Sequence, residues 1–344
     1  MSTGGIDILG LFFMPTWVIV LIVGMISYLN SAAILVYVER RVASFIQNRV
    51  GPNRVGPFGL LQPLADVAKL LLKEDVTPTQ GNKVLHAVAP MIPVVTALMT
   101  VAVIPFGENL YITDINAGVL FLLAVASLGV YGVTLAGWAS NSKYSLLGGL
   151  RAAAQMISYE LPMGMAVASV VLVAGSLSVV QVAASQEYLW NVFINPIGAV
   201  IFIVAAFAEA NRTPFDLVEA EQELVGGFHT EYSGMKFGMF FLAEYMHVFI
   251  GSILITTFFF GSYHLPFAGY WLPELEPLAK GLLDVAVFSV KVCFWCFVFI
   301  WVRWTIPRFK YNQVMKLGWG RLLPLSILNF MLIAAGMYAY THLF

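Results

Sequence analysis

The chain has 344 residues, of which 60% are hydrophobic and only 11% are charged, and its formal net charge is −1. Soluble globular domains contain about 25% charged residues, so this composition excludes an ordinary soluble enzyme and a disordered chain. Eighteen basic residues against 19 acidic ones leave no basic excess for nucleic acid, and two cysteines cannot build a disulfide framework. We therefore expect an all-α integral membrane protein in which residues 1–344 form a single membrane domain.

Eight segments have the length and apolar character of membrane-spanning helices, each of which needs about 20 residues. They cover residues 17–38, 86–106, 118–138, 161–182, 192–209, 237–260, 282–304 and 322–341. None of them shows the alternating pattern of a membrane β-barrel strand. The sequence therefore predicts eight transmembrane helices and leaves no room for a separate soluble domain.

Lysine and arginine are distributed unevenly between the two ends of these helices. Sixteen of the 18 lie in four alternate segments, residues 39–83, 139–160, 210–236 and 303–321. The positive-inside rule then predicts that these basic-side loops face the bacterial cytoplasm, or the matrix if the chain is mitochondrial, and that both termini face the other side. These loops are also the long ones, so we expect partner subunits to dock there. The small residues of 139–160 permit close approach between helices.

The first basic-side loop contains two Gly-Pro turns, Gly51-Pro52 and Gly56-Pro57, followed by an amphipathic stretch over residues 58–74. Apolar residues recur at helical spacing in this stretch. The opposite face consists of Gln62, Asp66, Lys69 and Lys73. This pattern predicts an interfacial helix, and a solvated surface helix is the alternative.

The segment Glu209–Tyr232 holds six of the 19 carboxylates, on a side of the protein that is otherwise basic. Its four central acidic residues are Asp216, Glu219, Glu221 and Glu223. Like charges this close raise one another's pKa, so the loop is a candidate for taking up and releasing protons near neutral pH. An exposed acidic loop is the alternative interpretation.

Three further carboxylates, Glu160, Glu209 and Glu244, lie within the predicted spans or at their ends. Charged groups at membrane depth are costly and indicate function by default. Together with Glu39, at the end of the first span, they are candidates for a polar route from the acidic loop into the membrane.

Other reactive residues are interpreted as structural. Asp284 and Lys291 lie seven residues apart on one helical face, which favours a structural pair or a lysine that reaches the membrane interface. We interpret His247 as a packing residue. Cys293 and Cys296 form a C-x-x-C motif without further ligands, so the sequence predicts no metal or redox site there. No nucleotide, flavin or iron–sulfur motif is present.

Long motifs of this chain resemble a known family. They are Glu39-Arg40-Arg41, Gly51–Pro57, Leu61–Asp66, Ser140–Tyr144, Leu150–Gln155, Glu209–Tyr232, Ala243-Glu244-Tyr245 and Trp304–Arg308. In these motifs the chain resembles the H subunit of bacterial proton-pumping NADH:quinone oxidoreductase, respiratory complex I, whose mitochondrial counterpart is subunit 1. The resemblance extends from about Leu35 to Pro324.

The resemblance implies that the chain forms most of a chamber that admits quinone, the substrate, from the membrane. The residues implied to line the chamber or its entrance are Glu39, Arg40, Asp66, Lys69, Arg212 and Phe228. The residues implied to transfer protons are Asp216, Glu219, Glu221 and Glu223 in the acidic loop, continued by Glu160, Glu209 and Glu244. FMN and iron–sulfur clusters would be carried by partner subunits. The implied partners are quinone-site subunits of the peripheral arm, small membrane subunits and antiporter-like pumping subunits.

Three other functions remain open at this point. The closest is the related membrane subunit of a hydrogenase-type complex, which works without quinone. A stand-alone ion transporter is less compatible, because the chain shows no internal repeat. A pure scaffold has no need of carboxylates in the membrane. The intact acidic loop and the segment 51–66 favour the quinone enzyme.

Overall fold

The computed structural model describes residues 5–8, 12–108, 110–218, 225–271 and 276–343. This part of the chain is α-helical apart from one short hairpin, in which β1 (Gly5–Ile8) pairs antiparallel with β2 (Phe12–Pro15). The long helices are α1 (Thr16–Ile46), α2 (Gln62–Leu72), α4 (Met91–Val101), α5 (Gly118–Ala139), α6 (Lys143–Ala174), α9 (Pro196–Glu209), α11 (Gly234–Phe259), α13 (Pro277–Thr305) and α15 (Leu323–Leu343). The short helical elements are η1 (Pro57–Gly59), α3 (Lys83–Val88), α7 (Val179–Ala184), α8 (Asn191–Ile194), η2 (Gly227–His229), α12 (Ala268–Trp271), α14 (Tyr311–Leu317) and the π-helical turn η3 (Gly318–Leu322).

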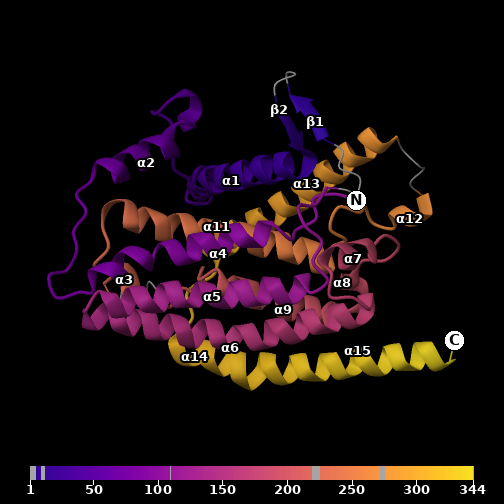
Figure 1. Cartoon of the computed structure of the whole chain (residues 1–344). Coiled ribbons are helices and arrows are strands. Elements are labelled where there is room, and N and C mark those ends of the chain that lie inside the picture. The colour runs from indigo at the N-terminus through magenta and orange to yellow at the C-terminus, as the bar shows by residue number, and fades with distance from the viewer. Residues whose placement is uncertain (1–4, 9–11, 109, 219–224, 272–275, 344) are drawn as a thin grey trace.

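Helices α1, α4, α5, α6, α11 and α15 lie side by side in a bundle, and α2 lies at its edge (Figure 1). Helix α6 packs between α5, α9 and α15, while α11 packs against α4, α13 and α1. Helices such as α5 and α11 are apolar on every face, as expected for helices surrounded by protein or lipid. The apolar core consists of one large cluster and a second, smaller cluster that contains Phe228, Tyr232 and Phe240. The buried charged groups described below are exceptions within this apolar interior.

Six helical stretches in the described part of the chain are long and apolar enough to cross a membrane. They are Lys83–Val101, Gly118–Ala139, Lys143–Ala174, Gly234–Phe259, Leu278–Thr305 and Tyr311–His342. Helix α9 is apolar but has only 14 residues. The architecture is that of an integral membrane protein.

Two predicted boundaries in the middle of the chain were wrong. The segment 139–160, predicted as a loop, is the first half of α6, which starts at Lys143. Glu160 therefore lies inside a helix of 32 residues and does not begin one. The same helix ends at Ala174, before the predicted 182, because Gly175 adopts a left-handed conformation (φ 68°) that terminates it.

The predicted span 192–209 is also interrupted. The chain breaks between α8 and α9 at Asn195, whose side-chain oxygen accepts a hydrogen bond from the backbone of Gly198 at 2.9 Å and so caps α9. Pro196 follows at the first helical position, where a proline is favoured. The polar cap and the proline thus begin a new helix inside a segment whose overall hydropathy predicts one continuous span.

The amphipathic helix predicted over 58–74 is present as α2, which packs against α1 and α11. None of its residues is buried, and Leu64, Leu71 and Leu72 are 62–88% exposed. The described part of the chain therefore leaves these leucines of α2 uncovered.

Small residues bring α5, α6 and η2 close together. A Cβ added at Gly137 in α5 would meet the carbonyl oxygen of Ser145 in α6 at 2.5 Å. A Cβ at Gly148 would meet the backbone nitrogen of Phe228 in η2 at 2.6 Å. The expected close approach in this region is present, and it holds η2 directly against α6.

Candidate functional site: a buried ionic cluster and two adjoining pockets

A buried ionic cluster joins four segments that are distant in sequence. Arg212, in the loop after α9, is 3% exposed and lies 2.7 Å from Glu244 of α11 and 3.3 Å from Glu39 of α1. Arg303, near the end of α13, pairs with the other oxygen of Glu39 at 2.5 Å. Buried charges are tolerated when they are paired in this way. The cluster therefore connects the loop after α9 to α1, α11 and α13 through ion pairs.

The surroundings of Arg212 keep its guanidinium charged. Burial by itself lowers the pKa of this group, but the Glu244 and Glu39 carboxylates outweigh burial and raise the pKa above its ordinary value. The guanidinium also lies over the ring of Tyr245, 4.3 Å from its centroid. Arg212 is thus a permanent cation between two carboxylates.

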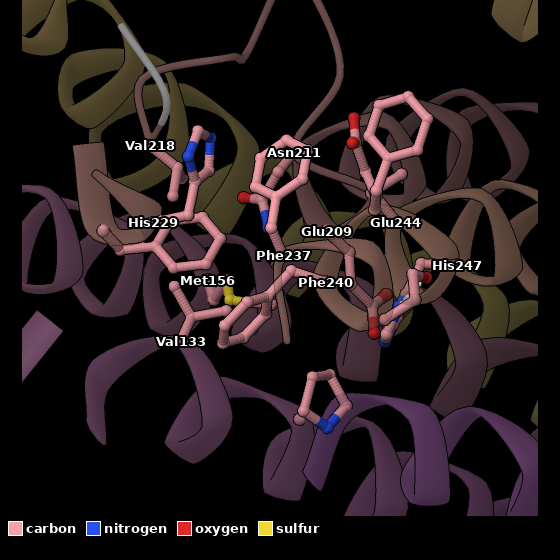
Figure 2. Close-up of a pocket in the computed structure, with 16 residues that line it drawn as sticks. Val133, Met156, Glu209, Asn211, Val218, His229, Phe237, Phe240, Glu244 and His247 are labelled. Carbon is pink, nitrogen blue, oxygen red and sulfur yellow. Dashed lines mark hydrogen bonds between the residues drawn. The ribbon is translucent and has the colours of Figure 1, made fainter. Parts of the chain in front are cut away.

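A pocket with an empty volume of about 610 Å³, including its open mouth, lies beside this cluster (Figure 2). Its polar lining residues are Glu209, Asn211, His229, Glu244 and His247. Its apolar lining includes Val133, Met156, Val218, Phe228, Phe237, Phe240 and Phe241. In Figure 2, Glu244 and His247 lie at one side of the pocket and Val218 and His229 at the other. The pocket has an aromatic wall and two carboxylates. This combination is suitable for an amphipathic ligand or for ordered water molecules.

A second pocket, with an empty volume of about 260 Å³, adjoins the first. It is lined by Ala126, Val130, Met156, Tyr159, Glu160, Met163, Ala205 and Glu209. Two residues, Met156 and Glu209, line both pockets. Glu244 and Glu160 therefore face separate cavities that meet at Glu209.

Polar contacts hold the two ends of this arrangement in place. Ser127 of α5 donates a hydrogen bond to the carboxylate of Glu160. The amide of Gln155, fully buried in α6, donates to the carbonyl oxygen of Ala208 at 2.8 Å and to the side chain of Asn211 at 3.2 Å. Gln155 thus fixes the end of α9, which carries Glu209.

The other residues predicted to line a quinone chamber lie in two places. Arg40 and Asp66 form an ion pair of 2.6 Å between α1 and α2. Lys69 lies on the same face of α2 and makes no ion pair with any described residue. Phe228 lies in the first pocket, beside η2. The structure therefore brings Phe228 close to the predicted carboxylates and leaves Arg40, Asp66 and Lys69 on α1 and α2.

The acidic loop is described only at its edges. Asp216 pairs with Arg308 at 2.7 Å, and Val218 lines the first pocket. Glu219, Glu221 and Glu223 lie outside the described residues.

The residues interpreted as structural have clear contacts. Nδ1 of His247 is 2.7 Å from the carbonyl oxygen of Ala243, although its ring also lines the first pocket. Lys291 donates to the carbonyl oxygens of Phe260, Ser262 and His264, at 2.5 to 2.9 Å. Asp284 accepts a hydrogen bond from the backbone of Glu108 and is not the partner of Lys291. Within the described residues, no group of three or more His, Cys, Asp or Glu side chains is placed to hold a metal ion.

Several residues of the site were not identified from the sequence. Neither Arg303 nor Arg308 was named as a candidate site residue, although each pairs with a candidate carboxylate. A basic residue at the end of an apolar helix, opposite unpaired acidic candidates, is a signal that could have found Arg303. Met156 offered no signal, because a methionine in an apolar helix usually packs in the core.

Comparison with known proteins identifies the family. Residues 18–334 match the family model described as NADH dehydrogenase. The NADH-quinone oxidoreductase subunit 8 of Rhodothermus marinus is 58% identical over 324 residues, covering 92% of this chain and 95% of the relative. The NADH-quinone oxidoreductase H subunit of Salinibacter ruber is 59% identical, covering 91% and 94%, and that of Flavobacterium johnsoniae is 48% identical, covering 87% and 88%. These matches confirm the resemblance carried by the motifs: the chain belongs to the NADH dehydrogenase family, among the NADH-quinone oxidoreductase membrane subunits that are named with the letter H or the number 8.

Proposed function

We propose that this chain forms the quinone access chamber of a proton-translocating NADH:quinone oxidoreductase and passes the effect of quinone reduction to pumping subunits through a series of carboxylates. The names of its relatives favour this role over a hydrogenase-type complex without quinone. The observation that carries the proposal is the pair of pockets that meet at Glu209, with Glu244 lining one and Glu160 the other.

The first pocket suits the inner end of a quinone chamber. Its wall is aromatic, with Phe228 held close by the glycine contact between α6 and η2. Its polar groups include Glu209, Glu244 and Asn211. The outer end of the chamber is assigned to α1 and α2, where Arg40, Asp66 and Lys69 lie.

The acidic loop is proposed to respond to quinone reduction. Asp216 is held by Arg308, and Val218, the last described residue before 219–224, lines the first pocket. A change of charge in Glu219, Glu221 or Glu223 would therefore occur at the edge of the pocket that contains Glu209. Coupled carboxylates exchange protons readily when the charge of a neighbour changes.

The route from Glu244 to Glu160 then runs through Glu209. A proton on Glu209 can be exchanged with water or a side chain in either pocket, because its side chain lines both. Met156 is the apolar residue beside it at the junction of the two pockets. The Glu39–Arg212–Glu244 cluster fixes the charge at the start of this route.

The proposal also includes the number of transmembrane helices and the side of the membrane on which each loop lies. Helices α1 and α9 add to the six candidate spans and bring the number of transmembrane helices to eight, and α2 lies in the membrane interface with its leucines facing lipid. The segments 39–83, 139–160, 210–236 and 303–321 lie on the cytoplasmic side, where the peripheral arm docks, and both termini lie on the opposite side. FMN and iron–sulfur clusters belong to partner subunits, and small and antiporter-like membrane subunits receive the carboxylate route.

The test is a pair of glutamine substitutions in the assembled complex. Glu209→Gln and Glu160→Gln each remove a proton-carrying group and preserve its shape, so we expect quinone reductase activity and proton pumping to fall several-fold while the complex still assembles. Glu187→Gln changes an exposed carboxylate that lines neither pocket and serves as the control. Normal reductase activity and pumping in both the Glu209 and the Glu160 variants would exclude the route.

A further inference from the structure

A third pocket lies outside the route described above, where α14 and η3 meet the start of α15. It has an empty volume of about 700 Å³, which includes open space at its mouth. Its lining residues are Phe309, Gln313, Lys316, Leu317 and Arg321. The pocket thus combines two cations with an aromatic and an aliphatic side chain.

The two cations of this pocket differ from their neighbours in the same segment. Arg303 and Arg308 are neutralised by Glu39 and Asp216. Neither Lys316 nor Arg321 forms an ion pair with a carboxylate in the part of the chain that the structure describes. The pocket therefore has a net positive charge that the described residues do not compensate.

The pocket lies at the depth of a membrane surface. The hydroxyl of Tyr159 donates to the carbonyl oxygen of Val314 at 3.0 Å, and the indole of Trp319 donates to Ser158 at 2.8 Å, so α14 and η3 pack against the middle of α6. From Ser158 to its end at Ala174, α6 has 17 residues, close to the length that crosses the hydrocarbon core. Trp319 is also 49% exposed, as tryptophans at the interface commonly are.

After Arg321 in the sequence, α15 carries a row of exposed leucines on one face. Leu325, Leu328 and Leu332 follow Arg321 at steps of four, three and four residues, which places all four side chains on one face of the helix. The three leucines are 42%, 53% and 56% exposed. An apolar track therefore runs into the membrane from the cationic pocket.

We propose that this pocket binds the phosphate headgroup of an anionic diacyl phospholipid, whose acyl chains lie along Leu325, Leu328 and Leu332. The guanidinium of Arg321 offers paired N–H donors that match phosphate oxygens, and the ammonium of Lys316 adds a second charge. Phe309 and Leu317 cover the apolar part of the headgroup region. A free phosphate ion would satisfy the cations but would leave the row of exposed leucines unused, so the lipid is the occupant that matches both features.

The experiment measures lipid retained by the purified complex. Complexes carrying Lys316→Gln and Arg321→Gln together are washed in detergent, and bound phospholipid is counted by native mass spectrometry, then titrated with phosphatidylglycerol, phosphatidylcholine or inorganic phosphate. Each cation near a membrane surface strengthens binding of anionic lipid roughly fivefold, so the double variant is expected to bind phosphatidylglycerol roughly 25-fold more weakly and to lose one tightly held lipid. Wild-type complex is expected to prefer phosphatidylglycerol over phosphatidylcholine, and phosphate is not expected to displace it.

The matched control is Lys83→Gln with Lys143→Gln, which removes two exposed cations from the same side of the protein but from outside the pocket. This variant is expected to hold the lipid as the wild type does. Arg321→Lys, which keeps the charge, is expected to bind more tightly than Arg321→Gln. Equal lipid retention by the pocket variant and the control would overturn the proposal. Loss of a neighbouring subunit from the pocket variant, without loss of lipid, would overturn it too, because an acidic segment of that subunit would then be the occupant.

Discussion

Arg212 and Glu244 lie 2.7 Å apart as a buried ion pair, the first in the loop after α9 and the second in α11. Glu39 approaches the same guanidinium from α1 at 3.3 Å. The loop that leads to the acidic residues is therefore anchored to two helices by one side chain. Because Glu244 also lines the first pocket, this anchor lies directly at the edge of the pocket.

Replacing Arg212 by methionine should destabilise the protein strongly. The change removes the Arg212 cation from both Glu244 and Glu39, although Glu39 keeps its contact with Arg303. Breaking a buried ion pair in this way costs about 3–5 kcal/mol. We expect a clearly lower Tm of the purified complex and less of this subunit in it. Arg49→Met, at an exposed position, should change stability by less than about 0.5 kcal/mol. An unchanged Tm for Arg212→Met would show that the cluster does not stabilise the loop.

The glycine contact between α6 and η2 gives a second prediction. A Cβ at position 148 would meet the backbone nitrogen of Phe228 at 2.6 Å, so Gly148→Ala must displace η2 and with it the wall of the first pocket. We expect a higher KM for quinone and a lower kcat. Gly164→Ala, on the same helix, is the control because nothing lies within 4 Å of the added methyl group. Equal kinetics of the two variants would contradict the assignment of Phe228 to the chamber.

The long helices could be predicted from the sequence because the membrane imposes long apolar stretches. Six of the eight predicted spans correspond to described helical stretches that are both long and apolar enough to cross a membrane. The errors occurred where local chemistry competes with hydropathy. The first half of α6 was predicted as a loop because it lies between two apolar spans and carries Lys143 and Arg151, whereas packing against α5 keeps it helical. Asn195 interrupts an apolar segment through a capping contact that hydropathy does not detect.

The sequence predicted which residues belong to the candidate site, but it did not predict the contacts between them. Glu39 and Glu244 were identified because charge is rare in an apolar chain, whereas Arg212 was identified only through the family resemblance. Their pairing depends on how α1, α11 and the loop pack, and Arg303 reaches Glu39 across 264 residues of sequence. No periodic pattern reports such a contact, which follows only from the tertiary structure.

Met156, which lines both pockets, gives a third prediction. It is 7% exposed and shares with Glu209 the position at which both pockets meet. Met156→Phe places a larger, stiffer side chain there, so we expect quinone reductase and pumping rates to fall several-fold in complexes of normal composition. Met156→Leu conserves volume, a change that usually costs less than about 1.5 kcal/mol, and should retain more activity than the phenylalanine variant. If both variants behave alike, the junction is not a passage on the route.

His264, in the loop after α11, predicts a pH dependence of stability. Burial, and then the charges of Lys291 and Lys280, lower the pKa of its imidazole from 6.5 to about 4. Between these two values the unfolded chain binds more protons than the folded one, so stability rises with pH in this range and is lost as the pH falls from about 6.5 towards 4. Above pH 6.5 both states are neutral at this residue and it contributes no pH dependence.

The measurement is the Tm of the purified complex at pH 7.5 and at pH 5. Many carboxylates also titrate as the solution becomes acidic, so the informative quantity is the difference between the wild type and His264→Gln, which cannot take up the proton. We expect the Tm of the glutamine variant to fall less between the two pH values. The backbone of residue 264 still accepts the hydrogen bond from Lys291 in this variant, which keeps the loop attached to α13. Equal decreases in Tm would mean that His264 takes up no proton on unfolding. The buried, neutral imidazole would then make no contribution to the loss of stability at low pH.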